Sequence, residues 1–153
     1  MTGRTKKMIS QLDRRAQFAF TRMCQLLDQR LGEEGYYVFE GLRTQETQEA
    51  YYAQGRESLA AVNEKRVRAG LYLLRNERQN YKITWTLHSR HMEGKAMDIV
   101  PLTAEGNPTW DLAHYRSQYE IIRDCGRSAG LECGADWDED MKDWPHYQVR
   151  EEQ

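Results

Sequence analysis

Two long stretches of the chain place apolar residues at every third or fourth position, the spacing that gives an α-helix one apolar face. The first covers residues 10–31 and is followed by Gly32, while Ser10 and Asp13 resemble a capping box at its start. The second covers residues 110–129 and is likewise followed by a glycine. We therefore expect two amphipathic helices that pack against the core of the protein.

Shorter segments rich in β-branched and aromatic residues are typical of strands. We predict strands over residues 36–40, 83–87, 96–100 and 146–149. Successive side chains of a strand point to opposite faces, so His146 and Gln148 share a face of the last strand. For the same reason Ala96, Asp98 and Val100 share a face of the strand before it. A carboxylate between two apolar residues is costly to bury without a partner, and a metal ion would relieve that cost.

Helical signals lie between the first two predicted strands. Thr44 is the expected N-cap of a helix that stops at Gly55, and residues 56–82 predict one or two short helical pieces. This second stretch is basic, and one hypothesis is that it forms a lid over a substrate-binding cleft. It has neither a phosphate-binding glycine loop nor an aromatic-interleaved basic patch, so we expect no nucleic-acid partner. Taken together, the elements predict an α+β fold in which a small, mainly antiparallel sheet packs against helices.

The length of 153 residues predicts one domain, covering residues 1–153. No run approaches the ~18 consecutive apolar residues that span a bilayer, so we expect no stable membrane insertion. The basic N-terminus leads into a charged segment in place of an apolar one, which predicts synthesis in the cytoplasm without a signal peptide. The three cysteines are widely spaced and include no CxxC pair, so we expect unpaired thiols with packing roles.

Charge is distributed unevenly along the chain, although the formal net charge is only −2. Residues 1–30 hold seven Lys/Arg and two Asp, whereas residues 131–153 hold eight Asp/Glu and two Lys/Arg. Negative potential at the acidic end favours a divalent cation. The basic end is either a solvated helix face or a contact for an anionic polymer or membrane surface, and charge alone leaves both open.

The residues that carry chemistry gather in two short stretches. The first runs from Ser89 to Asp98 and includes His91, and the second runs from Asp143 to His146. Together they offer two imidazoles, a carboxylate at the head of a strand and a spare carboxylate. That is the inventory of a catalytic zinc site, which needs three protein ligands, an open position for water and a general base.

These stretches resemble the signature of the M15 family of zinc peptidases, which cut peptidoglycan stem peptides. The family's Ser-x-His-x-x-Gly-x-Ala-x-Asp is complete at residues 89–98, and its later Asp/Glu-x-x-His is complete at residues 143–146. Further matches are Glu40-Gly41-Leu42-Arg43-Thr44 with Gln48, Trp110-Asp111, and Gly134-Ala135-Asp136-Trp137, where the family usually has Gly-Gly-Asp-Trp. The likeness covers roughly residues 10–150 and implies an M15 or hedgehog-like peptidase fold.

The resemblance implies roles for individual residues. The Zn²⁺ ligands would be His91, Asp98 and His146. Asp143, where many relatives carry Glu, would take a proton from water and pass it to the leaving amine, and Asp136 is the rival carboxylate. Arg43 would stabilise the oxyanion or clamp a substrate carboxylate. Ser89 would hydrogen-bond the substrate or orient the loop that carries the first histidine.

Within the family, the likeness is nearest to phage endolysins with L-alanyl-D-glutamate endopeptidase activity. The resemblance therefore implies a monomeric Zn²⁺ enzyme that cuts stem peptides between L-Ala and D-Glu. It would act on the cell wall or periplasm after release from the host cytoplasm. Two alternatives stay open: a D-Ala-D-Ala carboxypeptidase or dipeptidase with the same zinc site, and a non-catalytic, zinc-stabilised cell-wall-binding module.

Overall fold

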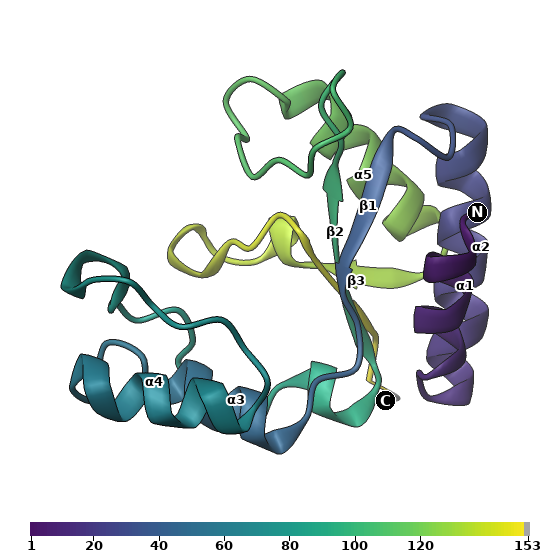
Figure 1. Cartoon of the computed structure of the whole chain (residues 1–153). Coiled ribbons are helices and arrows are strands. Elements are labelled where there is room, and N and C mark those ends of the chain that lie inside the picture. The colour runs from purple at the N-terminus through teal and green to yellow at the C-terminus, as the bar shows by residue number, and fades with distance from the viewer. Residues whose placement is uncertain (152–153) are drawn as a thin grey trace. The chain divides into compact units, whose positions relative to one another are not determined.

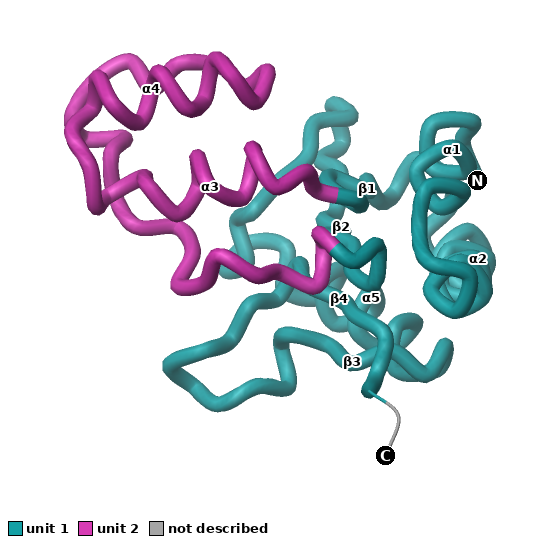
Figure 2. Tube along the Cα trace, turned by 90° about the horizontal axis from the view of Figure 1, so that it is seen from below, with its two compact units in different colours: residues 1–42, 93–153 teal, residues 43–92 magenta. Residues whose placement is uncertain are grey.

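The structure, a computed structural model, describes residues 1–151. The described chain forms two compact units. One unit contains residues 1–42 together with the chain from Glu93 onward, and the other contains Arg43–Met92 (Figure 2). The expectation that residues 1–153 act as one domain stays a prediction.

The first unit is built on a four-stranded sheet, whose strands are β1 (Tyr36–Glu40), β2 (Ala96–Pro101), β3 (Leu131–Cys133) and β4 (His146–Val149). The strand order is β1-β2-β4-β3 and every pairing is antiparallel. The predicted antiparallel sheet and the strands at residues 36–40, 96–100 and 146–149 are thereby confirmed. The sequence did not predict β3, because three residues are too few to display an alternation.

The helices of the first unit are α1 (Gly3–Ser10), α2 (Arg14–Arg30) and α5 (Arg116–Ser128). The expectation of one continuous helix over residues 10–31 is wrong. Ser10 ends α1, and Asp13 precedes α2 without a side-chain cap, so the two do not form a capping box. The apolar spacing nevertheless continues across the break because α1 and α2 lie side by side (Figure 1) and bury residues in one core.

The second predicted helix begins later than expected, at Arg116 in place of residue 110. The residues before it form a turn that is held by Asp111. Its carboxylate accepts a hydrogen bond from the His114 N–H at 3.2 Å, and its carbonyl accepts one from the Tyr115 N–H at 3.0 Å. Asp111 therefore stabilises a turn ahead of the helix, and the exposed His114 belongs to that surface turn.

The core lies between these helices and the sheet. Its most fully buried large side chains include Phe20, Met23 and Leu27 of α2, Tyr119 and Ile122 of α5, and Met97, Ile99 and Tyr147 of the sheet. All three cysteines are buried and unpaired, as expected. Within residues 1–151, none of the helices combines the length and apolar character needed to cross a membrane.

The second unit contains α3 (Gln45–Ala53), α4 (Leu59–Arg68), the short 3-10 helix η1 (Glu77–Gln79) and most of η2 (Arg90–Glu93). Thr44 caps α3 as predicted, since its hydroxyl oxygen accepts the Thr47 N–H at 3.2 Å. The helical pieces predicted within residues 56–82 are α4 and η1.

The predicted strand over residues 83–87 is wrong, because this segment pairs with no other strand among the described residues. Threonine hydroxyls satisfy part of its backbone locally. Thr84 Oγ1 accepts the Thr86 N–H at 3.4 Å, and Thr86 Oγ1 accepts the His88 N–H at 2.9 Å. Such side-chain bonds compete with a strand ladder. The alternation of apolar and polar residues is real, but its apolar members Ile83 and Trp85 are exposed.

Candidate metal centre

His91 lies on η2, a single 3-10 turn that leads into β2. Its N–H donates to Ser89 Oγ at 3.2 Å, and its carbonyl accepts the Arg43 N–H at 3.0 Å, so the backbone is held from two sides. Its side chain is buried. Gly94 follows with a φ of 68°, and a Cβ there would lie 3.0 Å from the backbone nitrogen of Asp13. Only glycine fits this turn without strain.

Asp98 and His146 belong to neighbouring strands and are direct partners in the antiparallel pairing of β2 and β4. His146 Nδ1 lies 3.4 Å from Asp98 Oδ1, with both side chains largely buried. Two ligands of a tetrahedral zinc ion, each at about 2.0–2.1 Å from the metal, lie about 3.3 Å apart. The spacing of this pair therefore fits zinc.

The pKa of His146 reflects the same neighbours. Burial pulls it down, but the hydrogen bond and charge of Asp98, the contact with Gln148 and the charge of Asp143 together raise the pKa above its ordinary value. The carboxylates of Asp98 and Asp143 thus place negative charge near His146, which suits a divalent cation.

His91, Asp98 and His146 each offer one ligand atom, and these atoms lie within 4.8 Å of one another. Two imidazoles and one carboxylate form the donor set of many catalytic zinc sites, in which three protein ligands leave one position open. Strand pairing brings together Asp98 and His146, two of the three residues predicted from the sequence as ligands, and the chemistry of all three fits zinc.

Asp143 is an exposed residue three positions before His146. Its N–H donates to the Gly134 carbonyl at 3.0 Å, and its own carbonyl accepts the His146 N–H at 3.1 Å. Gly134 begins the 3-10 turn η3 (Gly134–Asp136), and a Cβ on it would lie only 2.1 Å from the Asp143 carbonyl oxygen. The missing side chain at Gly134 therefore sets the position of the Asp143 backbone.

The departure from the family's Gly-Gly-Asp-Trp falls on Ala135, the position next to this contact. Ala135 is buried and is accommodated by the fold. The first glycine of the motif is the one with no room for a side chain, and the second position accepts one. Neither the spacing nor the composition of the sequence shows which of these two motif positions requires glycine.

Asp136, the rival to Asp143, is occupied by a pairing with an arginine. Its carboxylate accepts hydrogen bonds from both Nε and Nη2 of Arg127, the former at 2.9 Å. The hydrogen bond with Arg127 lowers the pKa of Asp136. A carboxylate held in this way is a weak base, so Asp143 is the better candidate.

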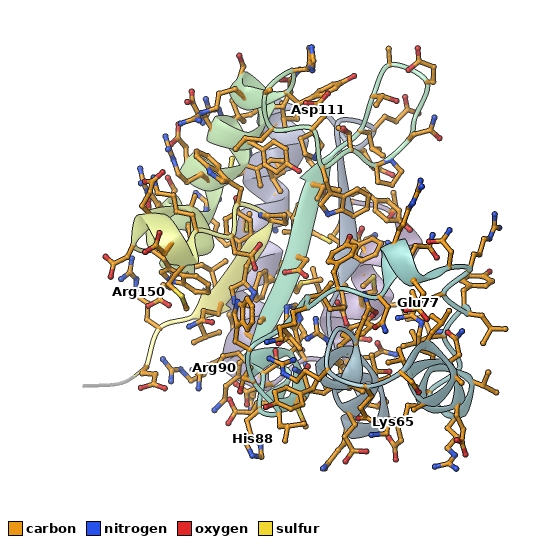
Figure 3. All side chains as sticks on the ribbon, turned by 90° about the vertical axis from the view of Figure 1, so that its left-hand side faces the viewer. Lys65, Glu77, His88, Arg90, Asp111 and Arg150 are labelled. Atoms are coloured by element: carbon orange, nitrogen blue, oxygen red, sulfur yellow. The ribbon has the colours of Figure 1, made fainter. Side chains whose placement is uncertain are left out.

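Arg43 and Ser89 both belong to the second unit. Arg43 Nη1 donates to Gln48 Oε1 at 2.7 Å, and its guanidinium lies over the Tyr51 ring at 5.0 Å from the centroid. Gln48 is fully buried and also donates to the Thr86 carbonyl at 2.7 Å, so it orients Arg43 from a fixed position. Ser89 orients the backbone of the turn that carries the first histidine. Figure 3 labels its two neighbours, His88 and Arg90.

Sequence reasoning gave no role to three residues that support this centre: Gly134, Glu132 and Gln148. Gln148 Oε1 lies 2.8 Å from His146 Nε2, and Gln148 Nε2 donates to Glu132 Oε2 at 2.8 Å. The alternation along β4 had already put Gln148 on the face of His146. Glu132 carries no such signal, because its place depends on a strand that the sequence did not reveal.

This chain is similar to known proteins in part of its sequence and in its fold. Residues 82–149 match the Peptidase_M15_4 family model, described as D-alanyl-D-alanine carboxypeptidase. Among solved structures, the chain is similar to the L-Ala D-Glu endopeptidase ChiX of Serratia marcescens, with 25% identity, a TM-score of 0.55, and coverage of 98% of this chain and 89% of that one.

A second solved structure is the zinc complex of the E175A mutant of the vancomycin-resistance D,D-pentapeptidase VanY. It matches with 18% identity, a TM-score of 0.49, and coverage of 90% of this chain and 72% of that one. No curated protein sequence matches the chain.

Proposed function

We propose that this chain is a zinc peptidase of the M15 family, one of whose models its residues 82–149 match, and that it hydrolyses the stem peptides of peptidoglycan between L-Ala and D-Glu. The observation that carries the proposal is the likeness to the Serratia L-Ala D-Glu endopeptidase, which extends over 98% of the chain.

The residues that would hold the zinc ion are His91, Asp98 and His146. When bound, zinc supplies a Lewis acid that polarises a carbonyl and lowers the pKa of water in the site. The protein's own contribution is to fix the two strand-borne ligands. Asp98 and His146 sit opposite each other in a regular sheet, so backbone pairing sets their separation before any metal arrives.

Asp143 acts as the general base. Its carboxylate accepts the proton of the attacking water and then donates it to the amine that leaves as the peptide bond breaks. The side chain of Asp is one methylene shorter than the Glu found in many relatives. The tight contact between Gly134 and the Asp143 backbone supports a position fixed by close packing.

Arg43 binds the substrate. Its guanidinium is oriented by Gln48 and the Tyr51 ring, so its forked donors are fixed in advance for a carboxylate or a developing oxyanion. Stem peptides carry carboxylates at D-Glu and at their termini, which matches this donor. Ser89 orients the turn before His91 and, as a further part of the proposal, contacts the substrate.

The biological setting is also part of the proposal. We assign the chain the role of a phage-type endolysin, made in the host cytoplasm and acting on the cell wall after release. A second candidate activity is D-Ala-D-Ala carboxypeptidase, which the description of the matching family model favours.

Digestion of purified peptidoglycan tests these activities. We expect fragments with a new N-terminal D-Glu, detected by mass spectrometry, which disappear with a chelator and return with zinc. Release of free D-Ala would indicate the carboxypeptidase instead. No metal-dependent release from any peptidoglycan type would leave the non-catalytic binding module.

Two matched variants assign the base. Asp143→Asn is expected to lower kcat by roughly 100-fold to 10,000-fold, the usual contribution of general acid–base catalysis, with zinc content unchanged. Asp140→Asn removes an exposed carboxylate from the same acidic loop and serves as the control, with activity retained. Equal losses in both variants would overturn the assignment of Asp143.

A further inference from the structure

We propose that Glu132, acting through the amide of Gln148, fixes which ring nitrogen of His146 faces the metal. Glu132 and Gln148 are thus positioning residues for the zinc site. The inference rests on the proposed function, because it takes His146 to be a ligand. It concerns side chains of the first unit only.

The three residues form a continuous hydrogen-bonded row across two strands. Glu132 on β3 and Gln148 on β4 are direct partners in the antiparallel pairing, and Gln148 shares a face with His146 two residues earlier. Gln148 Nε2 donates to Glu132 Oε2 at 2.8 Å, and Gln148 Oε1 lies 2.8 Å from His146 Nε2.

Trp137 completes the arrangement. Its indole N–H donates to the same Glu132 oxygen at 3.2 Å, and its ring lies 5.1 Å from the His146 ring, centroid to centroid, at a tilt of 44°. The carboxylate of Glu132 therefore receives two hydrogen bonds, and the imidazole is held both by an amide at its edge and by an aromatic ring beside it.

The chemistry of these groups allows one orientation. An ionised carboxylate only accepts hydrogen bonds, so Glu132 requires the NH₂ group of Gln148 to face it. The amide oxygen of Gln148 must then face His146, and an oxygen accepts only from a nitrogen that carries hydrogen. His146 Nε2 is thereby fixed as an N–H, so Nδ1 is the nitrogen whose lone pair a bound zinc ion would take, in place of the proton that Nδ1 shares with Asp98.

The remaining nitrogen lies beside Asp98, the neighbouring candidate ligand. Nδ1 is the atom that lies 3.4 Å from Asp98 Oδ1, the spacing expected of two ligands on one zinc ion. A zinc ligand of histidine usually donates its other N–H to an oxygen, which fixes the tautomer and the ring orientation. Gln148 supplies that oxygen here. Glu132 stabilises this orientation, because a flipped Gln148 amide would place its oxygen against the carboxylate, and both oxygens only accept hydrogen bonds.

The test is the substitution Glu132→Gln, which keeps the size of the side chain and its capacity to bond Trp137. The new amide can present either its oxygen or its NH₂ group to Gln148, so the side chain of Gln148 is no longer held in one orientation. We expect the Kd for zinc, measured by competition with a chromophoric chelator, to rise about 10-fold to 100-fold. Imidazole ¹⁵N shifts are expected to show a mixture of His146 tautomers in place of one.

A compensating variant separates positioning from general damage. Adding Gln148→Glu to Glu132→Gln puts an acceptor-only group directly against His146 Nε2, so the Kd for zinc is expected to return to within about threefold of wild type. Glu105→Gln, a loop carboxylate that makes none of these bonds, is the control and should leave the Kd unchanged.

The outcomes distinguish this inference from the proposed function. If wild type binds zinc and cleaves peptidoglycan while Glu132→Gln has an unchanged Kd and a single His146 tautomer, the inference about Glu132 is overturned and the function stands. If His146→Ala binds zinc as tightly as wild type does, His146 is not a ligand and the proposed metal site itself fails.

Discussion

Asp98 and His146 face each other directly across β2 and β4, and their side-chain atoms Oδ1 and Nδ1 lie 3.4 Å apart. Backbone pairing alone brings these two groups together, so two of the three proposed zinc ligands meet as the chain forms its sheet. The flanking Ala96 and Val100 on the face of Asp98 are fully buried. The carboxylate therefore sits in a place that favours ion pairing or metal binding over hydration.

Asp98→Asn keeps the shape of this side chain but removes its charge. We expect the Kd for zinc to rise by at least about 100-fold, the upper end of what loss of an outer partner of a zinc ligand costs. Peptidoglycan hydrolysis should fall in parallel. Zinc content after dialysis and turnover of the same preparation measure both effects, and stoichiometric zinc in this variant would contradict the ligand assignment.

Gly134→Ala places a methyl group where the Asp143 carbonyl oxygen already lies, 2.1 Å from the new Cβ. The loop must move, and misplacing a catalytic group by about 1 Å can cost about 100-fold in rate. We expect kcat to fall by roughly 10-fold to 100-fold with zinc content retained. The matched control is Ala135→Gly at the next position, where activity should persist and stability should drop by at most about 1 kcal/mol.

The Asp136–Arg127 pair predicts a pH dependence of stability. The hydrogen bond with Arg127 lowers the pKa of Asp136 in the folded protein, so the pair stabilises the fold above the ordinary pKa of Asp, 3.8. This contribution is lost as the pH falls through the lowered folded-state pKa. Both side chains are partly exposed, so solvent screening limits the effect to below about 1 kcal/mol.

Asp136→Asn should therefore unfold at lower denaturant concentration than wild type at pH 7. The difference between the two midpoints is expected to shrink below about pH 4, where Asp136 in the unfolded chain is protonated. Denaturant titrations at pH 7 and pH 3 compare the midpoints. A difference that grows toward low pH would contradict the assignment of the pair.

Gln48 joins two parts of the second unit, and two substitutions separate its roles. Gln48→Glu keeps an acceptor for Arg43 but removes the donor to the Thr86 carbonyl, whereas Gln48→Leu removes both. Leaving a buried polar group unpaired costs about 1–3 kcal/mol, so both variants should be less stable than wild type. Only Gln48→Leu should also raise KM strongly, because it alone releases Arg43. Denaturation midpoints and steady-state kinetics measure the two effects.

The sequence predicts the regular and locally encoded parts of this structure. Strands β1, β2 and β4 are rich in β-branched and aromatic residues, and the proposed ligands lie at fixed spacings within short motifs. The break between α1 and α2 was missed because Ile9, Leu12 and Ala16 all enter one core and preserve the helical period.

Long-range pairing explains the other differences. Residues 83–87 alternate like a strand, but a strand forms only beside a partner, and alternation carries no information about one. The role of Glu132 depends on β3 pairing with β4 at a particular register. Likewise, the need for glycine at position 134 arises from contact with Asp143, nine residues along the chain.

The three buried cysteines have a consequence for where this fold can operate. Burial raises the pKa of Cys24 to about 12 and that of Cys133 to about 11, and it also raises the pKa of Cys125. Oxidation and disulfide exchange require an accessible thiolate, which none of these side chains provides at neutral pH. A fold with no disulfide to form and no reactive thiol to lose does not depend on the redox potential of its surroundings. It can fold in a reducing compartment and keep the same covalent structure in an oxidising one.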